Sequence, residues 1–523
     1  MPKNKYFLYT LIASFLLLSC TDTNVISNFN EKNTESDKII LTPEEFTSIA
    51  YDAPQELSDE EITNVISDFK NNIETKKVAT TRNSKLSKVA IKKKYYITQN
   101  NNIIETITTT RSSIPNELAV PIFNVELAND DGSKSLAVVC GDERMPEVLF
   151  YTDNYCPDSE TDNRIGYLLE VSKKNILLDI QHIEDIKSTK RDSTLYKIAQ
   201  QLNIPQREVS YQNIKDQIIT TDEVSTRNNN PGNPAGGVEK PKSEVVGFVN
   251  PLSKVEWSQN TPYNSAMPVM MIFDDVNSEY EGHIVVGCAN LAIGMLFSII
   301  KPAMSIKDNQ KVDWNYVTSV DHIVSKPWQP ELSSPQDLID MISGLLYKIY
   351  VDTGSHPAYE DKVLQDIETG SKYTKSVITQ TETSTPNMIN YLRSMTNFSG
   401  DQKTKFDGNL AKQSLFERKP VFLFGSGHIV DKDGNITGKL GGHAWLIDGV
   451  VITRHPRRAG YYHYWSVNIG WGIGSKAYFR TSNDLQDCDV IFKTKKEYVA
   501  YYTQEMTMLY NITRTRKKTA KFG

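Results

Sequence analysis

Three polar residues follow one another along the C-terminal half of the chain in an order that can support nucleophilic catalysis. Cys288 stands where an apolar, strand-like run ending in Gly287 passes into a helical run. The positive end of a helix dipole and its unpaired amide hydrogens favour a thiolate at such a position. His443 follows two glycines, and Asn468 lies in a Gly-rich aromatic segment further on. This is the order in which a thiol nucleophile, its base and an orienting amide occur in one class of enzyme.

Each of these residues also has an ordinary structural interpretation. A lone cysteine is more often a small buried hydrophobic residue than a nucleophile. A histidine beside an apolar run is more often a core residue, and a Gly-rich aromatic segment is also typical of a hairpin. The hypothesis of a thiol nucleophile therefore rests on the order of Cys288, His443 and Asn468, and not on any one of them.

Other kinds of chemistry have less support in the sequence. It contains no CxxC, HExxH or G-x-S-x-G motif, the patterns typical of zinc sites and serine hydrolases. Asp431 to Asn435 has spacing like that of a calcium loop, but the twelfth position is Gly442 and not glutamate, which favours a hairpin turn. We therefore expect no metal and no cofactor.

The elements that must position this chemistry lie between about residues 240 and 511. Ser334 and Pro335 mark the cap and first position of a helix with one apolar face, and Gly354 follows its end. After about Lys419, apolar runs alternate with glycine turns in the manner of strands. Helices first and a twisted antiparallel sheet second are compatible with an α+β domain.

A separate region precedes this one, from about residue 41 to residue 225. Thr42 with Glu45, and Ser58 with Glu61, have the spacing of a capping box at a helix start. Five strand-like runs follow, separated by turn-forming residues: Tyr95 to Thr98, Ile103 to Thr108, Val120 to Leu127, Leu136 to Cys140 and Val148 to Thr152. The pattern predicts an α+β domain, and it contains no catalytic constellation.

The two regions are separated by a stretch of different composition. Ser225 to Gly237 contains no large apolar residue. Such a stretch cannot bury enough surface to offset its chain entropy, so we expect an exposed, protease-sensitive linker. It is either a plain connector or a cleavage site.

The N-terminus has the features of an export signal. Lys3 and Lys5 precede the apolar run Phe7 to Leu18. A membrane-spanning helix needs about 20 residues, so this run is too short to span and fits a signal peptide. The run ends in Leu-Leu-Ser before Cys20, which resembles a bacterial lipobox, in which the cysteine is lipidated. An ordinary signal peptide with an incidental cysteine is the alternative.

Overall composition excludes several classes of partner. With 58 Lys and Arg against 64 Asp and Glu, the formal net charge is -6, which gives no indication of nucleic-acid binding. The short basic C-terminal tail is typical of a solvated end. Five cysteines are too few for a disulfide scaffold. The sequence does not decide whether Cys140 and Cys156 form a disulfide bond.

Six blocks of the second region resemble the streptopain family of papain-like cysteine peptidases. In chain order they are Trp257 to Asn264, Gly287-Cys288, Val312 to Trp314, Pro420-Val421, Gly441 to Ala444 with Ile447 to Gly449, and Val467-Asn468 with Gly470 to Gly472. The first region also resembles that family's inhibitory propeptide, in Leu136 to Arg144, Pro146 to Leu149 and Tyr151. The resemblance covers most of residues 90–500.

The resemblance implies a role for each matching polar residue. Cys288 would be the nucleophile, and His443 the general base and then the general acid. The amide of Gln259 would help to form the oxyanion hole. Asn468 would orient His443, and Trp471 would shelter that contact.

One position departs from the family. Its members usually read Asn-Trp-Gly-Trp where this chain has Ile469 in place of the first tryptophan. The departure weakens the expected support for His443. It keeps an alternative open, a non-catalytic or weakly active surface adhesin or inhibitor that retains the peptidase fold.

These observations together predict an organisation in six parts. They are a lipoprotein signal peptide (1–19), a tether (20–40), an inhibitory propeptide domain (41–225), a cleavable linker (226–240), a papain-like peptidase domain (241–511) and a basic tail (512–523). The fold class expected is α+β, with a papain-like catalytic domain preceded by an α+β prodomain.

The organisation implies a secreted, lipid-anchored cysteine endopeptidase made as a zymogen. The expected partners are protein or peptide substrates, its own propeptide as an inhibitor that covers the cleft, the membrane through lipidated Cys20, and an activating protease. The expected location is the bacterial cell envelope or surface, and cutting the linker would release the mature peptidase.

Overall fold

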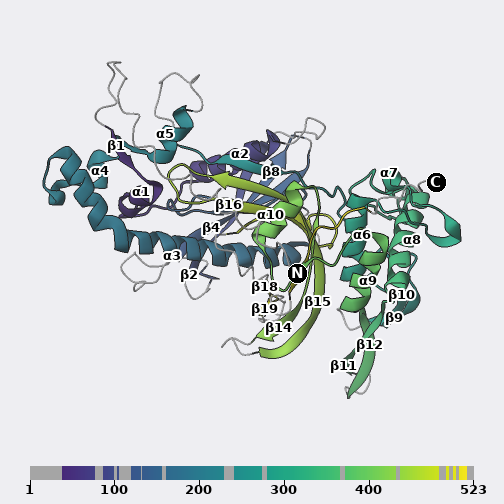
Figure 1. The fold of residues 1–523 in the computed structure, drawn as a ribbon. Coiled ribbons are helices and arrows are strands. Elements are labelled where there is room, and N and C mark those ends of the chain that lie inside the picture. The colour runs from purple at the N-terminus through teal and green to yellow at the C-terminus, as the bar shows by residue number, and fades with distance from the viewer. Residues whose placement is uncertain are drawn as a thin grey trace, which may run out of the picture.

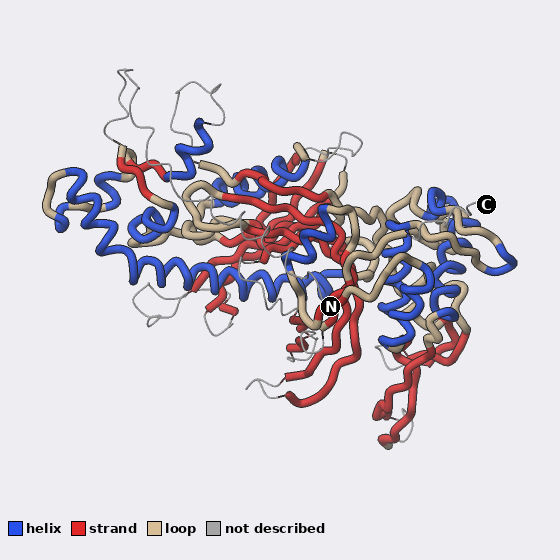
Figure 2. The backbone as a smooth tube through the Cα atoms, viewed as in Figure 1, coloured by secondary structure: helices blue, strands red, loops and turns tan. Residues whose placement is uncertain are grey.

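The computed structural model describes most of the chain (Figures 1 and 2). The described residues are 38–76, 86–98, 103–104, 119–130, 132–155, 161–228, 241–273, 279–365, 371–430, 436–481, 491–493, 499–501 and 506–514. The predicted signal peptide, Cys20, Cys156, the loop Asp431 to Asn435 and most of the basic tail lie outside them. Among the helices of the described part, none is long and apolar enough to cross a membrane.

A small lobe forms the N-terminal end of the described chain. Strand β1 (Ile39–Leu41) pairs in parallel with β7 (Ile218–Thr220), and α1 (Pro43–Ala50), η1 (Gln206–Glu208) and α4 (Tyr211–Ile214) complete the lobe. The predicted capping box is present, because Thr42 and Glu45 each bond the other's backbone N–H. The lobe has its own apolar core, which includes Ile39, Leu41, Phe46, Ile49 and Ile198.

The rest of the first region is an antiparallel sheet with helices packed beside it. Its strands are β2 (Leu86–Thr98), β3 (Ile103–Ile104), β4 (Ala119–Asn129), β5 (Lys134–Cys140) and β6 (Val148–Thr152), so the α+β prediction for this region is confirmed. Helix α2 (Asp59–Glu74) begins at the second predicted capping box, formed by Ser58 and Glu61. Buried Cys140 is a free thiol.

A long helix, α3 (Thr161–Leu202), connects this sheet to the N-terminal lobe. Figure 1 shows it running along the sheet and out to α1 and α4. Its inner face buries Ile176, Ile180 and Ile183 in the main core and Ile198 in the core of the lobe. Sequence analysis did not identify this helix.

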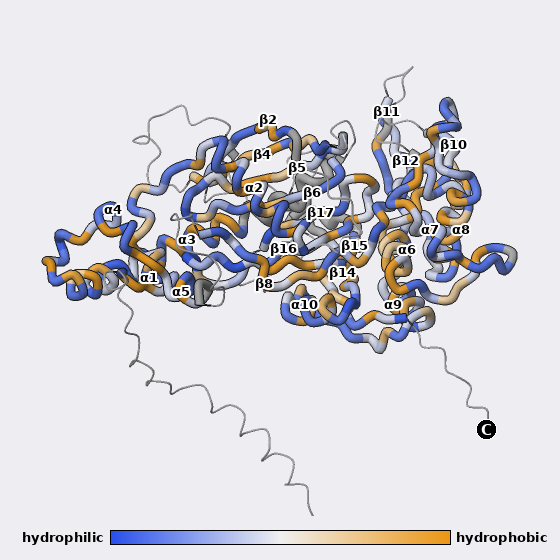
Figure 3. The backbone as a smooth tube through the Cα atoms, turned by 90° about the horizontal axis from the view of Figure 1, so that it is seen from above, coloured by the Kyte–Doolittle hydropathy of each residue, from blue (hydrophilic) through white to orange (hydrophobic). Residues whose placement is uncertain are grey.

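The second region begins with helices around a buried central one. Helix α6 (Cys288–Ile300) is almost entirely apolar, which is typical of a helix buried on all sides. Figure 3 shows this hydrophobic stretch among the other elements. Its companions are η2 (Lys307–Asn309), α7 (Trp314–Val317), η3 (Pro330–Leu332), α8 (Gln336–Asp352), α9 (Thr385–Met395) and α10 (Gly408–Phe416).

The start of α8 differs from its prediction. Pro335 is the N-cap, and no side chain caps the helix. The hydroxyl of Ser334 instead accepts from the backbone N–H of Val324, at 3.1 Å. The Ser334 hydroxyl, which local spacing predicted to cap the helix, therefore bonds the backbone of another segment instead. The C-terminal prediction is confirmed, because Gly354 follows the helix with a φ of 61°.

A twisted antiparallel sheet packs against these helices, as the papain-like fold class requires. Its central strands are β14 (Val421–Val430), β15 (Ile436–Arg454), β16 (Tyr462–Asn468) and β17 (Lys476–Thr481). It is completed by β8 (Glu244–Val249), β13 (Gln402–Lys403), β18 (Ile491–Lys493), β19 (Val499–Tyr501) and β20 (Thr507–Leu509).

A second, smaller sheet projects from the helices of this region. Its order is β10-β9-β12-β11, with β9 (Val269–Phe273), β10 (Glu279–His283), β11 (His356–Gln365) and β12 (Lys372–Glu382). Figure 1 shows the β11–β12 hairpin extending away from the body, with its base near α6.

The first region joins the second edge to edge. Strand β6 pairs antiparallel with β17, through Tyr151 with Tyr478 and Phe150 with Phe479, so the two sheets are continuous. Buried charges accompany this pairing. Glu147 accepts from Arg458 and from the hydroxyl of Tyr464, both at 2.6 Å. The first region is therefore held by strand addition and by buried ion pairs.

A helix precedes and overlaps the segment predicted as a linker. Helix α5 (Thr221–Asn228) includes Ser225 and the first residues of the predicted linker, 226–228. Its first turn is held to the second region, because Asp222 pairs with Arg454 and Glu223 with Arg457. These long-range ion pairs stabilise a helix that has little apolar surface of its own. The rest of the predicted linker, 229–240, lies outside the described residues.

Candidate active site

Cys288 is the first residue of α6, at the base of the helix that forms the core of the second region. The residue before it, Gly287, is the N-cap and has a φ of 87°. A Cβ at Gly287 would lie 3.1 Å from the side chain of Thr381 and 3.2 Å from its carbonyl oxygen. Glycine is therefore needed here both for the backbone conformation and for the close approach of β12.

His443 lies on β15, 6% exposed, with its ring against two indoles. The ring centroids are 5.9 Å from Trp445 and 5.0 Å from Trp471. Nε2 is 3.1 Å from the carbonyl oxygen of Ile469. Because a carbonyl oxygen only accepts, Nε2 carries the proton, and in the neutral ring Nδ1 is then the basic nitrogen.

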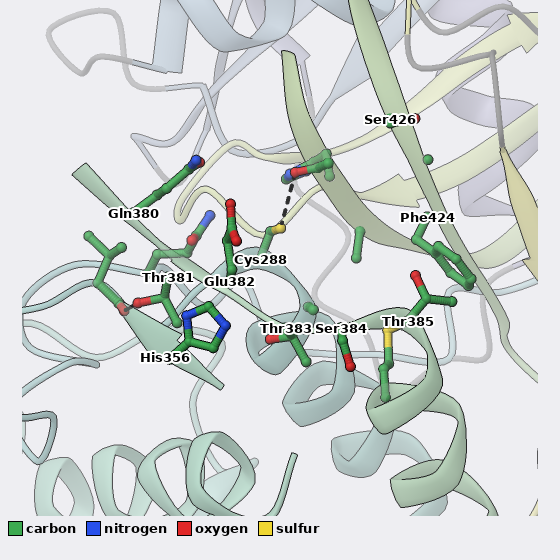
Figure 4. A pocket seen from close by; sticks show the side chains of 18 of the residues that line it. Cys288, His356, Gln380, Thr381, Glu382, Thr383, Ser384, Thr385, Phe424 and Ser426 are labelled. Atoms are coloured by element: carbon green, nitrogen blue, oxygen red, sulfur yellow. Dashed lines mark hydrogen bonds between the residues drawn. The ribbon is translucent and has the colours of Figure 1, made fainter. Parts of the chain in front are cut away.

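The sulfur of Cys288 lies beside the residue that precedes the histidine. Its thiol donates to the carbonyl oxygen of Gly442, at 3.6 Å, and Cys288 and His443 line the same pocket. The pocket has a volume of about 810 Å³. Figure 4 shows the thiol and this contact from within the pocket.

The electrostatics of the pair differ from the thiolate expected at a helix N-terminus. Burial raises the pKa of the Cys288 thiol, although the backbone N–H groups of Ala444, Ala289 and Cys288 itself act in the opposite direction. Burial also lowers the pKa of His443 to about 4, against the effect of the Ile469 carbonyl. For the thiol, desolvation outweighs the backbone hydrogen bonds. In this conformation the pair is a neutral thiol and a neutral imidazole.

Gln259 lines the same pocket as Cys288 and His443. Its carbonyl oxygen accepts from the backbone N–H of Val286, at 3.0 Å, which ties it to the strand-like run before Cys288. The fully buried Trp257 anchors the segment, and its carbonyl oxygen accepts from the N–H of Gly472. The half-buried Gln259 side chain therefore stands on a fixed backbone.

Asn468 is fully buried and supports the loop that contacts the histidine. Its amide donates to the carbonyl oxygen of Val255, at 2.7 Å, and its oxygen accepts from the N–H of Gly470, at 3.2 Å. Trp471, placed in the resemblance beside the histidine, packs on the ring. The Nε2–H of His443 donates to the main-chain oxygen of Ile469. Ile469 is the residue that stands where the family usually has tryptophan.

One wall of the pocket comes from residues that sequence analysis did not identify. It is built by the end of β12 and the start of α9: Thr379, Gln380, Thr381, Glu382, Thr383, Ser384, Thr385 and Met388, with His356 of β11 beside them. Nothing in their local sequence distinguishes them from an ordinary hairpin, because only the fold brings this strand to α6. No described residue of 38–228 lines the pocket.

The described residues contain no group of three or more His, Cys, Asp or Glu side chains placed to hold a metal ion. The polar groups of the pocket are thus a thiol, two imidazoles, amides, hydroxyls and one carboxylate. A pocket that is lined by a thiol, a basic ring nitrogen and amide donors can support attack on a carbonyl carbon and stabilise the oxyanion that forms.

Comparison with known families agrees with this geometry. Residues 257–479 match the model of the Peptidase C10 family. The second region is a Peptidase C10 domain. The match contains Gln259, Cys288, His443, Asn468 and Trp471, and it confirms the resemblance to the streptopain family.

Two further comparisons concern the whole chain. A search of curated proteins finds no match. Among solved structures, a fragment of prointerpain A from Prevotella intermedia is similar, with 14% identity and a TM-score of 0.38 over 75% of this chain and 96% of that chain. The family assignment of the Peptidase C10 domain rests on the match to the family model.

Proposed function

We propose that this protein is a cysteine endopeptidase that hydrolyses peptide bonds through Cys288 and His443. The match of residues 257–479 to the Peptidase C10 family supports a cysteine peptidase. The observation that carries the catalytic proposal is the tautomer of His443. With Nε2–H bound to Ile469, Nδ1 is the unprotonated nitrogen of the neutral ring and can take the proton of the thiol.

The proposed reaction begins with transfer of the Cys288 proton to Nδ1 of His443. The sulfur attacks the peptide carbonyl carbon, and the oxyanion is stabilised by the backbone N–H of Cys288 and the amide of Gln259. The imidazolium then protonates the leaving amine, which departs and leaves a thioester. Water, deprotonated by His443, hydrolyses the thioester and regenerates the thiol.

A substrate must first change the ionisation of this pair. Burial disfavours both the thiolate and the imidazolium, so the neutral pair is the resting form. Transfer of the proton creates both charges together, and their attraction offsets part of the desolvation cost. A bound substrate that places dipoles beside the sulfur, or a movement that admits water to the pocket, would favour transfer of the proton from Cys288 to His443.

We further propose that the first region is an inhibitory propeptide. Its described residues do not line the pocket, so the expected direct covering of the cleft is not made by them. It does contact the segments that form the site. Asn154 donates to Glu256 at 2.5 Å, and the other oxygen of Glu256 accepts from Gly474. These contacts adjoin the segment of Gln259 and the turn after Trp471, which supports inhibition through the loops of the site.

We also propose how the protein is activated and where it is located. A cut in the predicted linker, 226–240, would separate the first region, and with it Cys20, from the catalytic domain. While the two are tethered, the first region has a high effective concentration at its docking site, and after the cut it can dissociate. Lipidation at Cys20 would hold the uncut protein at the cell envelope, and the cut would release the peptidase.

Reaction with a thiol-directed epoxide tests the catalytic proposal and its main alternative. The cut protein should be labelled at Cys288 and should cleave peptides, and Cys288→Ala should lose both properties. Folded protein that is not labelled under reducing conditions would favour the adhesin or inhibitor. If the uncut, anchored protein cleaves peptides as fast as the cut form, the proposed latency is wrong.

A further inference from the structure

One side chain in the pocket carries a charge that the proposed reaction does not use. Of the described residues that line the pocket, Glu382 is the one with a carboxylate, and none is lysine or arginine. It is exposed at the end of β12, and Figure 4 shows it at the same wall as Cys288. A cleft lined by one sign of charge focuses the field of that charge on whatever enters it.

Glu382 is held close to the nucleophile by its neighbour in the chain. Thr381 donates its hydroxyl to the carbonyl oxygen of Val285, at 2.6 Å, and packs against Gly287, the residue before Cys288. Consecutive Cα atoms are about 3.8 Å apart, so the backbone of Glu382 lies one residue from this contact. The carboxylate therefore lies within reach of a substrate side chain flanking the bond under attack.

The wall is also fixed from within α6. Asn290, two residues after Cys288 and fully buried, accepts through its side-chain oxygen from Thr353 at 2.9 Å and from Ser355 at 3.1 Å. Ser355 and Thr383 are hydrogen-bonded to each other at 2.7 Å. These hydroxyls belong to the residues next to His356 and Glu382, which face each other across the two strands.

This network fixes the backbone near Glu382 relative to α6, the helix that begins at Cys288. The ends of β11 and β12 cannot shift relative to Cys288 without breaking the bonds to Asn290. A charged group held in place by its surroundings loses little freedom when it binds a partner, which is the requirement for a selective subsite. An ordinary surface glutamate has no such support.

We propose that Glu382 is a specificity-determining residue that selects substrates with a lysine or arginine side chain near the scissile bond. This inference rests on the proposed peptidase function. Gln380 of the same wall also lines the pocket, and its amide oxygen can accept a further hydrogen bond from an ammonium or guanidinium group. Ion pairing at the rim of a site mainly contributes selectivity.

The test compares peptides that differ at one position. A series with Lys, Gln or Glu at each position flanking the cleaved bond is offered to the full chain after the linker has been cut, and kcat/KM is measured. At one position Lys should be preferred to Gln by about three- to tenfold, as expected for a partly exposed ion pair. The preference should decrease with added salt, which screens exposed charges.

Variants assign the preference to one side chain. Glu382→Gln should bring the ratio of Lys to Gln close to one while peptides with Gln are still cleaved, and Glu382→Lys should favour Glu. The matched control is Glu360→Gln, an exposed glutamate of the same hairpin that does not line the pocket, and it should keep the preference. Thermal melts that match the unmodified protein show that the variants are folded.

The outcomes separate this inference from the function on which it rests. Cleavage with no preference for Lys, or a preference that survives in Glu382→Gln, overturns the role of Glu382 and leaves the peptidase standing. If no peptide in the series is cleaved and Cys288 does not react with the epoxide, the proposed function is wrong and the inference fails with it.

Discussion

The Nε2–H of His443 donates to the main-chain carbonyl oxygen of Ile469, at 3.1 Å. The acceptor belongs to the backbone, so the orientation of the imidazole does not depend on which side chain residue 469 carries. Ile469 itself is buried. The isoleucine that departs from the family pattern is thus compatible with an oriented histidine, because the part of the residue that contacts the ring is common to all amino acids.

Asn468 supports the loop that carries Ile469, and its contribution to stability can be measured. In Asn468→Ala the buried carbonyl oxygen of Val255 and the N–H of Gly470 lose their partners. Unsatisfied buried groups cost about 1–3 kcal/mol each, so the free energy of unfolding in urea should fall by at least that amount. Ile469→Val keeps the carbonyl and should cost about 0.5–1.5 kcal/mol.

Measurements of turnover distinguish support of the loop by Asn468 from a direct action of its side chain on the imidazole. If Asn468 acts by bracing the loop, the loss of activity in Asn468→Ala should follow the loss of stability and be partly recovered at lower temperature. A variant with normal stability and no turnover would show instead that Asn468 acts on the imidazole itself.

Gln259→Ala should lower kcat by about 10²–10³ if its amide binds the oxyanion. The side chain is half-buried on a backbone tied to Val286, so the substitution should leave the fold intact. Steady-state kinetics and epoxide labelling measure the two properties separately. Near-normal turnover would remove Gln259 from the mechanism and leave Cys288 as the nucleophile, since labelling should persist in either case.

Stability should fall on acidification because buried histidines stay neutral in the fold. Burial lowers the pKa of His443 to about 4, and burial with the nearby charge of Lys412 lowers that of His463 to about 4. The unfolded chain has values near 6.5, so between about pH 6.5 and pH 4 it binds more protons than the folded protein. The free energy of unfolding should therefore decrease as the pH falls through this window.

His463→Gln tests the pH dependence without touching the pocket. Its neutral amide does not titrate, so the variant should lose less stability than the unmodified protein between pH 6.5 and pH 4 in urea titrations. An equal slope in the two proteins would mean that His463 does not titrate differently on folding.

Docking of the first region should depend on Glu147. In Glu147→Ala the buried guanidinium of Arg458 and the hydroxyl of Tyr464 lose their acceptor. Removing one member of a buried ion pair costs about 3–5 kcal/mol, because the other charge stays desolvated. After the linker is cut, the two fragments of the variant should separate at a higher protein concentration than those of the unmodified protein, as measured by gel filtration of a dilution series.

The control for docking is an exposed pair within the first region. Glu44 pairs with Lys190 at the surface, and such pairs contribute about 1 kcal/mol or less. Glu44→Ala should therefore leave co-elution unchanged. If Glu147→Ala fragments also stay together, the strand pairing of β6 with β17 is sufficient for docking.

The sequence alone determined the features that depend on neighbouring residues. Both capping boxes at Thr42 and Ser58 are formed, because their partners are three residues away. The start of α6 at Cys288 follows from an apolar run after a glycine. The family blocks identified the Peptidase C10 region for the same reason, since each is a short, contiguous string.

The tertiary structure decided what depends on contacts between distant segments. The ionisation of Cys288 and His443 follows from burial, which no local pattern contains. The hydroxyl of Ser334 accepts from the backbone N–H of Val324 and does not cap α8. Helix α5 is stabilised by ion pairs of its first turn with Arg454 and Arg457. The wall that carries Glu382 is held at the nucleophile by hydrogen bonds of Asn290 and Thr381 to residues far along the chain. Spacing along the sequence does not encode such contacts.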